Sequence, residues 1–539
     1  MATKHAPLAG SLASANSHQL PGFALVLIRI ILFLFGLNLY AGSPFEIGWD
    51  LTTYLAIAKN IALGHGFINF DGQPATDRPA LELILAGALR LTHFSMPAIA
   101  WMTFGLNALL GVMLFDLARR LYDWRVGLIA AISFLGSSSL LVRNPQIVDP
   151  LWPTFVIASL LLMLSRNLDG RIAAILAALA MAAAGLVKIF ALLTVPVCMM
   201  APLIAGVRFA GRRAAWYAIV LALLLGAWFA VRNFWLEGAS HVMSDEERLY
   251  AFALNRLMNG QSLTDRDVVS LAVGSDSIST GGASLVGIAT VAQYLIHGLW
   301  VYFAGSDGLY RNLPLAGAPI AAVVLTALRA LWTKRANDII VVALLVVLLP
   351  FVGICGALGY RFTQALLFIA LFYLASAAIL MTIVDRITTN QLVSTGATAL
   401  LAMAICVSAT GKWSYRSIVL GGTGRLEVST FHEYDKLAPQ LMAGVDSGML
   451  VATNNEQLAS LLFLRDNASI RVRRLPTNPA EAVDWLKVNK PDRVVVATGQ
   501  GLGSYPPGVI TASDAYRQVS IDDRSRYAFQ FFAKVSGAQ

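Results

Sequence analysis

The stretch FALVLIRIILFLFGLNLY, Phe23 to Tyr40, decides the fold class, because it is the first of many apolar runs in the chain. It is too long for the apolar core of a typical signal peptide, so we expect an uncleaved first membrane span; cleavage after Ala41 is the alternative. Similar runs of roughly 17 to 25 residues follow, and helices of about this length cross a bilayer. The runs are continuous rather than alternating, which excludes an outer-membrane barrel.

The composition is that of a membrane protein. Of 539 residues, 57% are hydrophobic and only 13% are charged, whereas about a quarter of the residues of a soluble protein are charged. The net charge of +9 could suggest nucleic acid in a soluble protein. Here much of the Lys and Arg lies in short clusters between apolar runs, which indicates a topology signal and no nucleic-acid partner. The three cysteines lie in apolar runs without disulfide or metal-ligand spacing.

We expect about eleven spanning helices, with an N-terminal tail (1–22) in the cytoplasm. Every cytoplasmic turn then carries Lys or Arg, as the positive-inside rule predicts. The expected spans are 23–41, 99–118, 127–143, 150–165, 171–187, 189–206, 214–235, 313–332, 338–355, 362–382 and 391–410. The basic residues of the cytoplasmic loops are Arg119, Arg120, Arg125, Arg166, Arg171, Arg208, Arg212, Arg213, Arg329, Lys334, Arg335 and Arg386.

Two further apolar stretches do not fit as full spans. Residues 81–92 are too few to cross and include Glu82, so we expect an interfacial helix. Residues 284–303 are numerous enough to cross, but counting them would invert the sidedness of every later loop. We therefore expect an interfacial or re-entrant helix on the outer face. The transmembrane domain thus covers residues 23–410, with long outer loops at 42–98 and 236–312.

From about Trp413 the composition changes to that of a small α/β domain. The patterns GMLVATNN, IRVRRLP and RVVVATG are typical of short buried strands, and helical patterns lie between them. An odd number of spans places this domain, residues 411–539, outside the cytoplasm. The expected fold class is therefore a polytopic α-helical membrane protein with a small C-terminal extracytoplasmic α/β domain.

The outer face collects ionisable residues, which are functional candidates because burial of a charge is costly. Each also has an ordinary structural interpretation. Asp50 can be the N-cap of a helix over 51–62, and Asp149 can cap the fourth span, followed by Pro150 at its first position. A Lys such as Lys188 can extend its charge to the membrane interface, and each Arg can anchor its helix there. The residues concerned are Asp50, Asp77, Arg78, Glu82, Arg143, Asp149, Lys188, Arg232 and Arg361.

Two carboxylates combined with several cations have a chemical use. A carboxylate can remove a proton from an attacking hydroxyl, and cations at helix ends can hold a phosphate. A glycosyl phosphate is a good donor, because its phosphate leaves as an anion that requires positive charge rather than a strong general acid. Tyr54 lies one turn after Asp50 on the same helix face, where it could contact sugar or acceptor.

The order of these motifs resembles the GT-C superfamily of integral-membrane glycosyltransferases, and in particular bacterial relatives of the protein O-mannosyltransferases and the lipid A aminoarabinose transferase. The family carries an Asp in the first outer loop, followed by an interfacial helix, as in GWDLTTYLAIAKNIALGHGF at Gly48–Phe67. A Pro-containing segment follows, here DRPALELILAGAL, in which Ala80 replaces the second Pro. Later motifs are RNPQIVDPLW, GLVKIF, WFAVRNFWLEG and GYRF, which contain Asp149, Lys188, Arg232 and Arg361.

The resemblance implies a polyprenyl-phosphate-linked sugar donor, used at the outer face of the cytoplasmic (inner) membrane. It also implies transfer with inversion to a hydroxyl of a glycan, lipid or protein acceptor of the envelope. Asp50 has no acidic neighbour, unlike the paired first-loop acids of some branches. No metal ligands are therefore assigned, and a divalent metal is an open alternative.

The resemblance also suggests roles for the candidate residues. The first-loop carboxylate would act as general base or orient the acceptor hydroxyl, and the second would position acceptor or sugar or support the first loop. The cations would share the donor phosphate. The catalytic candidates are Asp50 and Asp149; the phosphate-binding candidates are Lys188, Arg232 and Arg361; and the substrate-binding candidates are Tyr54, Arg78 and Glu82.

Two other function classes stay open at this point. A transporter or flippase for a lipid-linked saccharide would show paired half-chain repeats and broken helices near the midplane, and the sequence shows no convincing repeat. A scaffold for an envelope assembly complex would lack an outer cavity that joins Asp50 to the basic residues.

Overall fold

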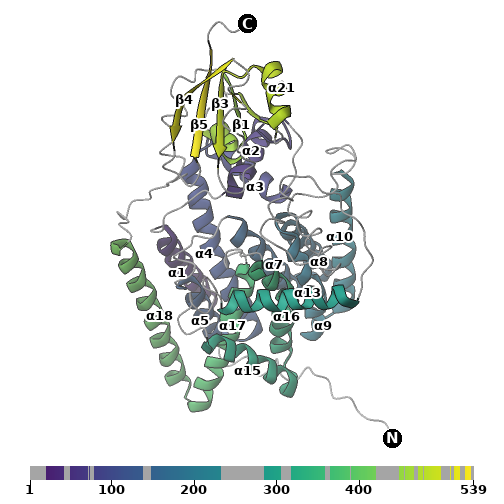
Figure 1. The fold of residues 1–539 in the computed structure, drawn as a ribbon. Coiled ribbons are helices and arrows are strands. Elements are labelled where there is room, and N and C mark those ends of the chain that lie inside the picture. The colour runs from purple at the N-terminus through teal and green to yellow at the C-terminus, as the bar shows by residue number, and fades with distance from the viewer. Residues whose placement is uncertain are drawn as a thin grey trace. The chain divides into compact units, whose positions relative to one another are not determined.

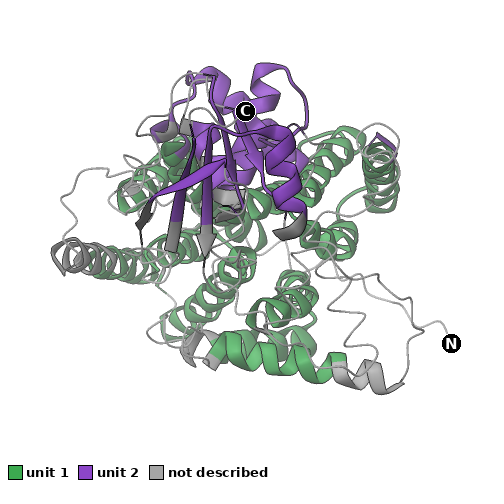
Figure 2. Ribbon diagram, turned by 45° about the horizontal axis from the view of Figure 1, so that its top comes forward, with its two compact units in different colours: residues 1–44, 100–229, 289–427 green, residues 45–99, 230–288, 428–539 purple. Residues whose placement is uncertain are grey.

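A computed structural model of the chain describes residues 20–41, 49–70, 72, 78–137, 147–231, 285–304, 317–357, 365–388, 390–419, 448–454, 456–465, 471–476, 479–498, 510, 515–522 and 528–535. The chain divides into two compact units, which are described separately (Figure 2). Unit 1 contains residues 1–44, 100–229 and 289–427, and unit 2 contains residues 45–99, 230–288 and 428–539.

Unit 1 is helical (Figure 1). Continuous apolar runs give its helices, because a helix satisfies its backbone hydrogen bonds internally where water is absent. The elements are α1 (Gly22–Ala41), α4 (Met96–Leu121), α5 (Trp124–Leu135), α7 (Val148–Leu164), α8 (Gly170–Val187), the 3-10 helix η3 (Ile189–Thr194), α9 (Val195–Ile204), α10 (Ala210–Val231), α13 (Leu285–Ala304), α15 (Gly317–Thr333), α16 (Ala336–Ala357), α17 (Leu366–Ile387) and α18 (Gln391–Val419).

The described part of the chain contains 6 helices long and apolar enough to cross a membrane. They are Gly22–Tyr40, Pro97–Leu121, Gly170–Val187, Ala210–Val231, Ala336–Gly356 and Leu366–Ile387, and each coincides with an expected span. The other expected spans contain shorter apolar helices in this part of the chain: Trp124–Leu135, Val148–Leu164, Ile189–Ile204, Ile320–Thr333 and Leu392–Ser408. The protein is therefore a multi-pass membrane protein.

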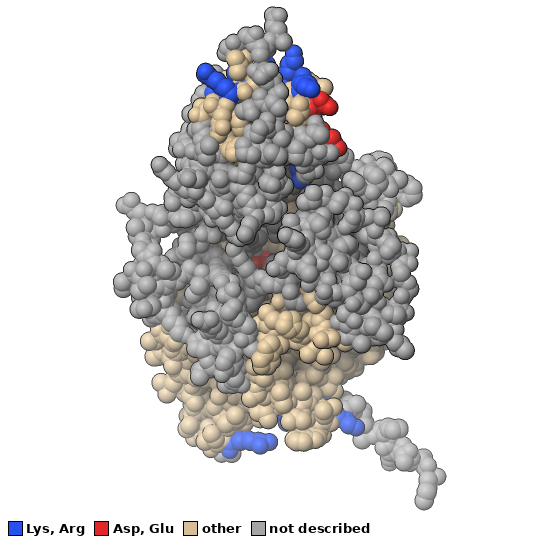
Figure 3. All heavy atoms as spheres, in the orientation of Figure 1, with Lys and Arg blue, Asp and Glu red and all other residues tan. Residues whose placement is uncertain are grey.

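The outer surface of these helices is apolar, as a lipid environment requires. Leu223 of α10 is 67% exposed and Leu400 of α18 is 69% exposed. Figure 3 shows uncharged residues over much of the described surface around α15, α17 and α18, with Lys and Arg at its lower rim.

The basic loops of unit 1 are joined to one another. Arg120 donates to the carbonyl oxygen of Leu164, at the end of α7. Arg213 donates to the carbonyl oxygens of Met163 at 2.8 Å and Ser165 at 2.6 Å. These arginines thus satisfy the carbonyls that a helix leaves without partners in its last turn. The contacts join the ends of α4 and α7 to the start of α10.

Two ion-pair networks bring further loops to the same end. Arg329 binds both carboxylate oxygens of the fully buried Asp338, at 2.6 and 2.7 Å, and Tyr122 donates to the same carboxylate at 2.7 Å. Arg125 binds Asp385 at the end of α17. Loops expected in the cytoplasm therefore lie together at one end of unit 1. We call this end, formed by residues 119–125, 163–171, 208–213, 329–338 and 385–394, the Arg-rich end.

Helix α13 crosses α16 at the opposite end. A Cβ at Gly356 would meet the carbonyl oxygen of Gly298, and one at Gly353 would lie 2.9 Å from the carbonyl oxygen of Leu295. Glycines at this crossing therefore let the two backbones touch. Both α16 glycines lie in its last turns, far from Asp338 at its start. In Figure 1, α13 runs across the direction of α10 and α16 rather than along it.

Unit 2 begins with two helices that pack against each other, α2 (Trp49–Leu63) and α3 (Pro79–Leu91). Pro79 starts α3 at a position where its missing N–H costs nothing. Leu81, Leu85 and Leu89 are fully buried at a spacing of one helical turn, which gives α3 its apolar face.

The C-terminal part of unit 2 forms a five-stranded mixed sheet in the order β2-β1-β3-β5-β4. The first three strands run parallel and have helices between them, as the alternation in the sequence predicts, and β5 pairs antiparallel with both β3 and β4. The elements are β1 (Leu450–Thr453), α20 (Glu456–Arg465), β2 (Arg471–Arg474), α21 (Pro479–Asn489), β3 (Arg493–Thr498), β4 (Tyr516–Asp522) and β5 (Ala528–Lys534).

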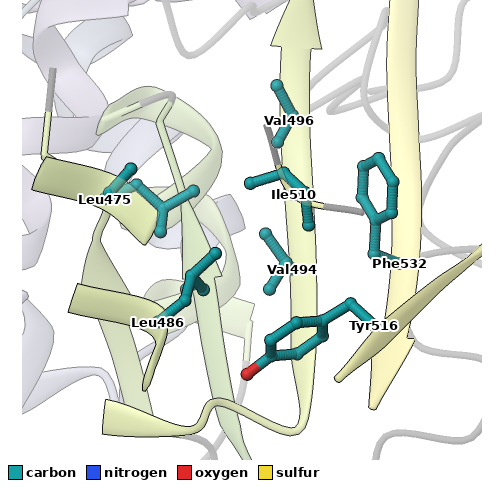
Figure 4. Packing of buried hydrophobic residues seen from close by; sticks show 9 residues of the cluster. Leu475, Leu486, Val494, Val496, Ile510, Tyr516 and Phe532 are labelled. Atoms are coloured by element: carbon teal, nitrogen blue, oxygen red, sulfur yellow. The ribbon is translucent and has the colours of Figure 1, made fainter. Parts of the chain in front are cut away.

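One side of this sheet packs against α21. Val494 and Val496 of β3 and Phe532 of β5 form a buried cluster with Leu486 of α21 (Figure 4). Val495 on the other side of β3 is also buried. Burial of both sides accounts for the continuous apolar run in RVVVATG.

Candidate functional site

Asp149 is buried in the first turn of α7. Only 6% of its surface is exposed. The helix starts at Val148, and Ile147 is the cap residue, without a side-chain hydrogen bond. The structural alternative, in which Asp149 caps the fourth span and Pro150 takes the first helical position, is therefore wrong: Asp149 is the second helical residue and Pro150 the third. A carboxylate in this turn is stabilised by the positive end of the helix dipole.

Lys188 lies at the turn between α8 and η3. Its backbone is extended, with φ of −153°. The turn brings Leu192 of η3 back against α8, since a Cβ at Gly185 would lie 2.7 Å from the Leu192 side chain. Lys188 is only 3% exposed. The alternative that it extends to the interface is therefore wrong, because the side chain is buried inside the protein.

Aromatic rings connect these two residues. Lys188 Nζ lies 5.2 Å from the ring centre of Phe351 in α16, within the range of a cation–π contact. Trp152 meets the same ring edge-on at 6.0 Å, and Phe190 stacks on it at 4.5 Å. Trp152 follows Asp149 by three residues and so lies on the same helix face. We call Asp149, Trp152, Lys188, Phe190 and Phe351 the Lys188 cluster.

The cluster lies at the end of unit 1 opposite the Arg-rich end. Helix α7 reaches the Arg-rich end at Met163 and Leu164, and α16 starts there at Asp338. At 1.5 Å per residue, Asp149 and Phe351 are each about 20 Å along their helices from that end. Helix α8 separates Lys188 from Gly170, which lies beside Arg213, by about 27 Å.

A second group of expected site residues comes together in unit 2. The Arg78 guanidinium lies 5.1 Å from the ring centre of Tyr54. The Arg78 N–H donates to Glu82 Oε1 at 3.2 Å, and the Glu82 N–H donates to the Arg78 carbonyl oxygen at 3.0 Å. All three residues are buried. Glu82 thus reaches back to the start of α3 like the acid of a capping box, a structural role that the sequence analysis did not assign.

Asp50 is the second residue of α2 and precedes Tyr54 by one turn. The helix includes Trp49, so the structural alternative, in which Asp50 is the N-cap of a helix over 51–62, is also wrong. Its backbone is in the first turn, where a carboxylate is favoured by the helix dipole.

Sequence analysis missed Lys59, which is buried in the middle of α2. Its Nζ donates to the carbonyl oxygen of Phe463 at 2.7 Å and lies 4.7 Å from the centre of that ring. Phe463 is in the last turns of α20, where the helix dipole favours a cation. A lysine within the apolar pattern AIAKNIAL was the signal that could have indicated this contact.

Several expected site residues lie outside the described residues: Asp77, Arg143, Arg232 and Arg361. The two phosphate-binding candidates among them therefore stay predictions. Within the described ranges, no group of three or more His, Cys, Asp or Glu side chains is placed to hold a metal ion.

Comparisons with known proteins support the fold. No family model and no curated protein sequence matches the chain. The structure of ArnT from Cupriavidus metallidurans in the apo state matches with a TM-score of 0.53 and 11% identity, over 95% of this chain and 97% of that chain. The archaeal oligosaccharyltransferase AglB from Archaeoglobus fulgidus, in complex with an inhibitory peptide and a dolichol-phosphate, matches with a TM-score of 0.53 and 11% identity, over 96% and 75%. Both are GT-C glycosyltransferases, so the resemblance inferred from the sequence is confirmed for the fold.

Proposed function

We propose that the protein is a glycosyltransferase that moves a sugar from a polyprenyl-phosphate donor to a hydroxyl of an envelope acceptor, at the outer face of the cytoplasmic membrane. The observation that carries the proposal is the Lys188 cluster, which holds a buried carboxylate and a buried ammonium group at one end of an apolar helical unit. Such charges are costly inside a membrane protein and mark a functional site by default.

The Lys188 ammonium supplies the charge that this reaction needs. As the glycosidic bond to the phosphate breaks, negative charge develops on the leaving phosphate oxygen. A cation held in a region of low dielectric stabilises that charge more than it would in water. Phe351 shields one side of the ammonium from water, and Phe190 stacks on the Phe351 ring and so backs that contact. Arg232 and Arg361 are proposed to share the phosphate.

The carboxylates serve the acceptor side. Asp50 would remove the proton from the attacking hydroxyl or orient it, and Asp149 would position sugar or acceptor. The α2–α3 group supports this division, because Tyr54 follows Asp50 by one turn of α2 and the Arg78 guanidinium, at the start of α3, lies over the Tyr54 ring. One displacement by the acceptor hydroxyl, with the phosphate leaving on the other side, inverts the anomeric centre.

The donor class has independent support. The AglB structure that shares this fold holds a dolichol-phosphate, a prenyl-linked phosphate. Fold alone does not establish function, so the residues have to be tested directly. A transporter of lipid-linked saccharide is the second candidate, and it predicts movement of the intact lipid without cleavage of its phosphate bond.

The test is sugar transfer by the protein in lipid nanodiscs, with labelled polyprenyl-phosphate sugars and a delipidated envelope extract as acceptor. We expect transfer by the wild type and a loss of about 10²- to 10⁴-fold in Asp50→Asn, the range that a general base contributes. Asp149→Asn should also lower the rate, because sugar or acceptor is then no longer positioned. The matched control is Asp169→Asn at the Arg-rich end. Asp169 caps α8 through the N–H groups of Arg171 and Ile172, and Asn caps a helix equally well. Full activity in both test variants would contradict the proposal.

Lys188→Met tests the phosphate role separately. It keeps a long side chain against Phe351 but removes the charge, so we expect the KM for the donor to rise and kcat to fall. Lys334→Met, at an exposed position of the Arg-rich end, should leave both unchanged. Equal kinetics in the two variants would remove Lys188 from the site.

A further inference from the structure

Arg29 and Asp116 form an ion pair between two membrane helices, α1 and α4. Arg29 donates from Nε to both carboxylate oxygens of Asp116, at 3.1 and 3.0 Å, and from Nη2 to Oδ1 at 2.7 Å. Asp116 lies about 8 Å along α4 from its last residue, Leu121, and therefore within an apolar membrane helix. Charges at such a depth are costly and indicate a functional site.

The same carboxylate faces a second arginine. Arg119, one turn later in α4, has its Nε 3.5 Å from Asp116 Oδ1. This Nε is buried and makes no hydrogen bond within the described part of the chain. One carboxylate neutralises one guanidinium, so the two arginines around Asp116 leave one positive charge that this group does not balance.

The other acidic side chains described at the Arg-rich end already have partners and do not supply the missing anion. Arg125 binds Asp123 and Asp385, Arg329 binds Asp338, and Asp169 accepts from the N–H groups at the start of α8. Arg120, next to Arg119, lies close enough to Arg166 and Arg213 to be repelled by both. The surroundings of the arginine group are therefore cationic.

The arginine group lies beside the lipid-facing surface of unit 1. Val26, one turn before Arg29, and Ile30 directly after it are each 51% exposed. The side chains of Arg29 and Arg119 are each 34% exposed. An anion that reaches this group next to an apolar surface has to combine a charged head with apolar chains, as a phospholipid does.

We propose that Arg29 and Arg119, at the junction of α1 and α4, bind the phosphate of an anionic phospholipid in the leaflet at the Arg-rich end. Arg29 contacts Asp116 through Nε and Nη2, so the two N–H groups of Nη1 serve the phosphate. Guanidinium groups match phosphate oxygens well, and basic pockets between spanning helices hold such head groups. The acyl chains lie along Val26 and Ile30. This site is separate from the proposed glycosyl transfer and does not depend on it.

The test measures binding of phosphatidylglycerol to the full-length protein in detergent by native mass spectrometry. Arg119→Gln removes one cation and leaves the Arg29–Asp116 pair in place. We expect the dissociation constant to rise about five- to tenfold, the effect of one cation near a lipid phosphate. Arg119→Lys keeps the charge and should bind the lipid more tightly than Arg119→Gln does.

The matched control is Arg386→Gln. Arg386 is an exposed arginine in the last turn of α17, at the same end of unit 1. Its loss removes the same charge without touching α1 or α4, so we expect unaltered affinity. An equal loss in Arg386→Gln and Arg119→Gln would overturn the inference, because the attraction would then come from the general charge of this end.

Two further probes separate the possible ligands. Phosphatidylcholine has a phosphate and acyl chains but no net charge, and glycerol 3-phosphate has the charge without acyl chains. We expect both to bind more weakly than phosphatidylglycerol. Equal binding of phosphatidylcholine would remove the need for an anion, and equal binding of glycerol 3-phosphate would assign the group to a soluble anion; either result would overturn the inference.

Thermal unfolding in nanodiscs distinguishes lipid binding from a structural role of Arg119. A ligand that binds the native state raises its unfolding temperature. The wild type should therefore unfold at a higher temperature in phosphatidylglycerol than in phosphatidylcholine. Arg119→Gln should match the wild type in phosphatidylcholine and gain less from phosphatidylglycerol. A lower unfolding temperature in both lipids, with an undiminished gain from phosphatidylglycerol, would show that Arg119 is structural only and would overturn the inference.

Discussion

Replacing Gly356 with alanine tests the crossing of α13 over α16, on which the position of the Lys188 cluster depends. The added Cβ would meet the Gly298 carbonyl oxygen and lie 2.8 Å from the carbonyl carbon and 2.9 Å from Cβ of Tyr302. Two of these atoms belong to the Gly298 backbone, and the third is the Cβ of Tyr302, whose position the backbone fixes. No side-chain rotation can therefore relieve the overlap. Helix α13 has to move away from α16.

The expected magnitude follows from two opposing effects. Overpacking of a close-packed interior costs typically about 1–3 kcal/mol. Alanine regains up to about 1 kcal/mol relative to glycine in a helix. We therefore expect the free energy of unfolding to fall by about 1–2 kcal/mol. Phe351 lies a turn and a half earlier on α16, so its displacement should also raise the KM for the donor.

The matched control is Gly226→Ala in α10, where a Cβ would meet no atom within 4 Å among the described residues. Thermal unfolding of both variants in the same nanodiscs gives the comparison. We expect Gly226→Ala to unfold at or above the wild-type temperature and Gly356→Ala several degrees below it. Equal unfolding temperatures would refute the close crossing of the two helices.

Further predictions address the other contacts. Lys59→Met should increase hydrogen exchange in both α2 and α20, because it removes the hydrogen bond and the ring contact that join them; unchanged exchange in α20 would contradict this contact. Arg329→Met leaves the buried Asp338 without its bidentate partner and should cost about 3–5 kcal/mol of stability, while Arg335→Met at an exposed neighbouring position should cost little; equal unfolding temperatures would argue against the ion pair. Burial, with a nearby carboxylate, raises the pKa of Tyr516 to about 12, so its contribution to the stability of the C-terminal domain is present below pH 10 and lost as the pH rises from about 10 to 12. Tyr516→Phe should flatten this part of a pH–stability curve, and an unaltered curve would assign the alkaline transition elsewhere.

Sequence patterns predicted the parts of the fold that local chemistry determines. Apolar run length identified the long membrane helices, and clustered Arg and Lys identified the loops that gather at the Arg-rich end. The continuous run in RVVVATG identified β3, because a strand buried on both sides has no alternation. Each of these signals lies within one short segment of the chain.

What depends on contacts between distant segments could not be predicted. Helix α7 starts one residue before Asp149, which excludes the capping alternative for this residue, and helix ends are poorly specified by sequence alone. The contacts of Lys59 with Phe463 and of Lys188 with Phe351 join residues that are far apart in the chain.

The most direct test of the central claim is the fate of the phosphate bond in a doubly labelled donor. Wild-type protein in sealed vesicles receives a polyprenyl-phosphate sugar with ³²P in the phosphate and ¹⁴C in the sugar. The account predicts that acceptor glycosylation releases one polyprenyl phosphate for each sugar transferred, with inversion at the anomeric carbon, and that Asp50→Asn lowers both by about 10²- to 10⁴-fold. Movement of the intact, doubly labelled lipid across the membrane, with no polyprenyl phosphate released, would contradict the proposed glycosyl transfer and favour a transporter.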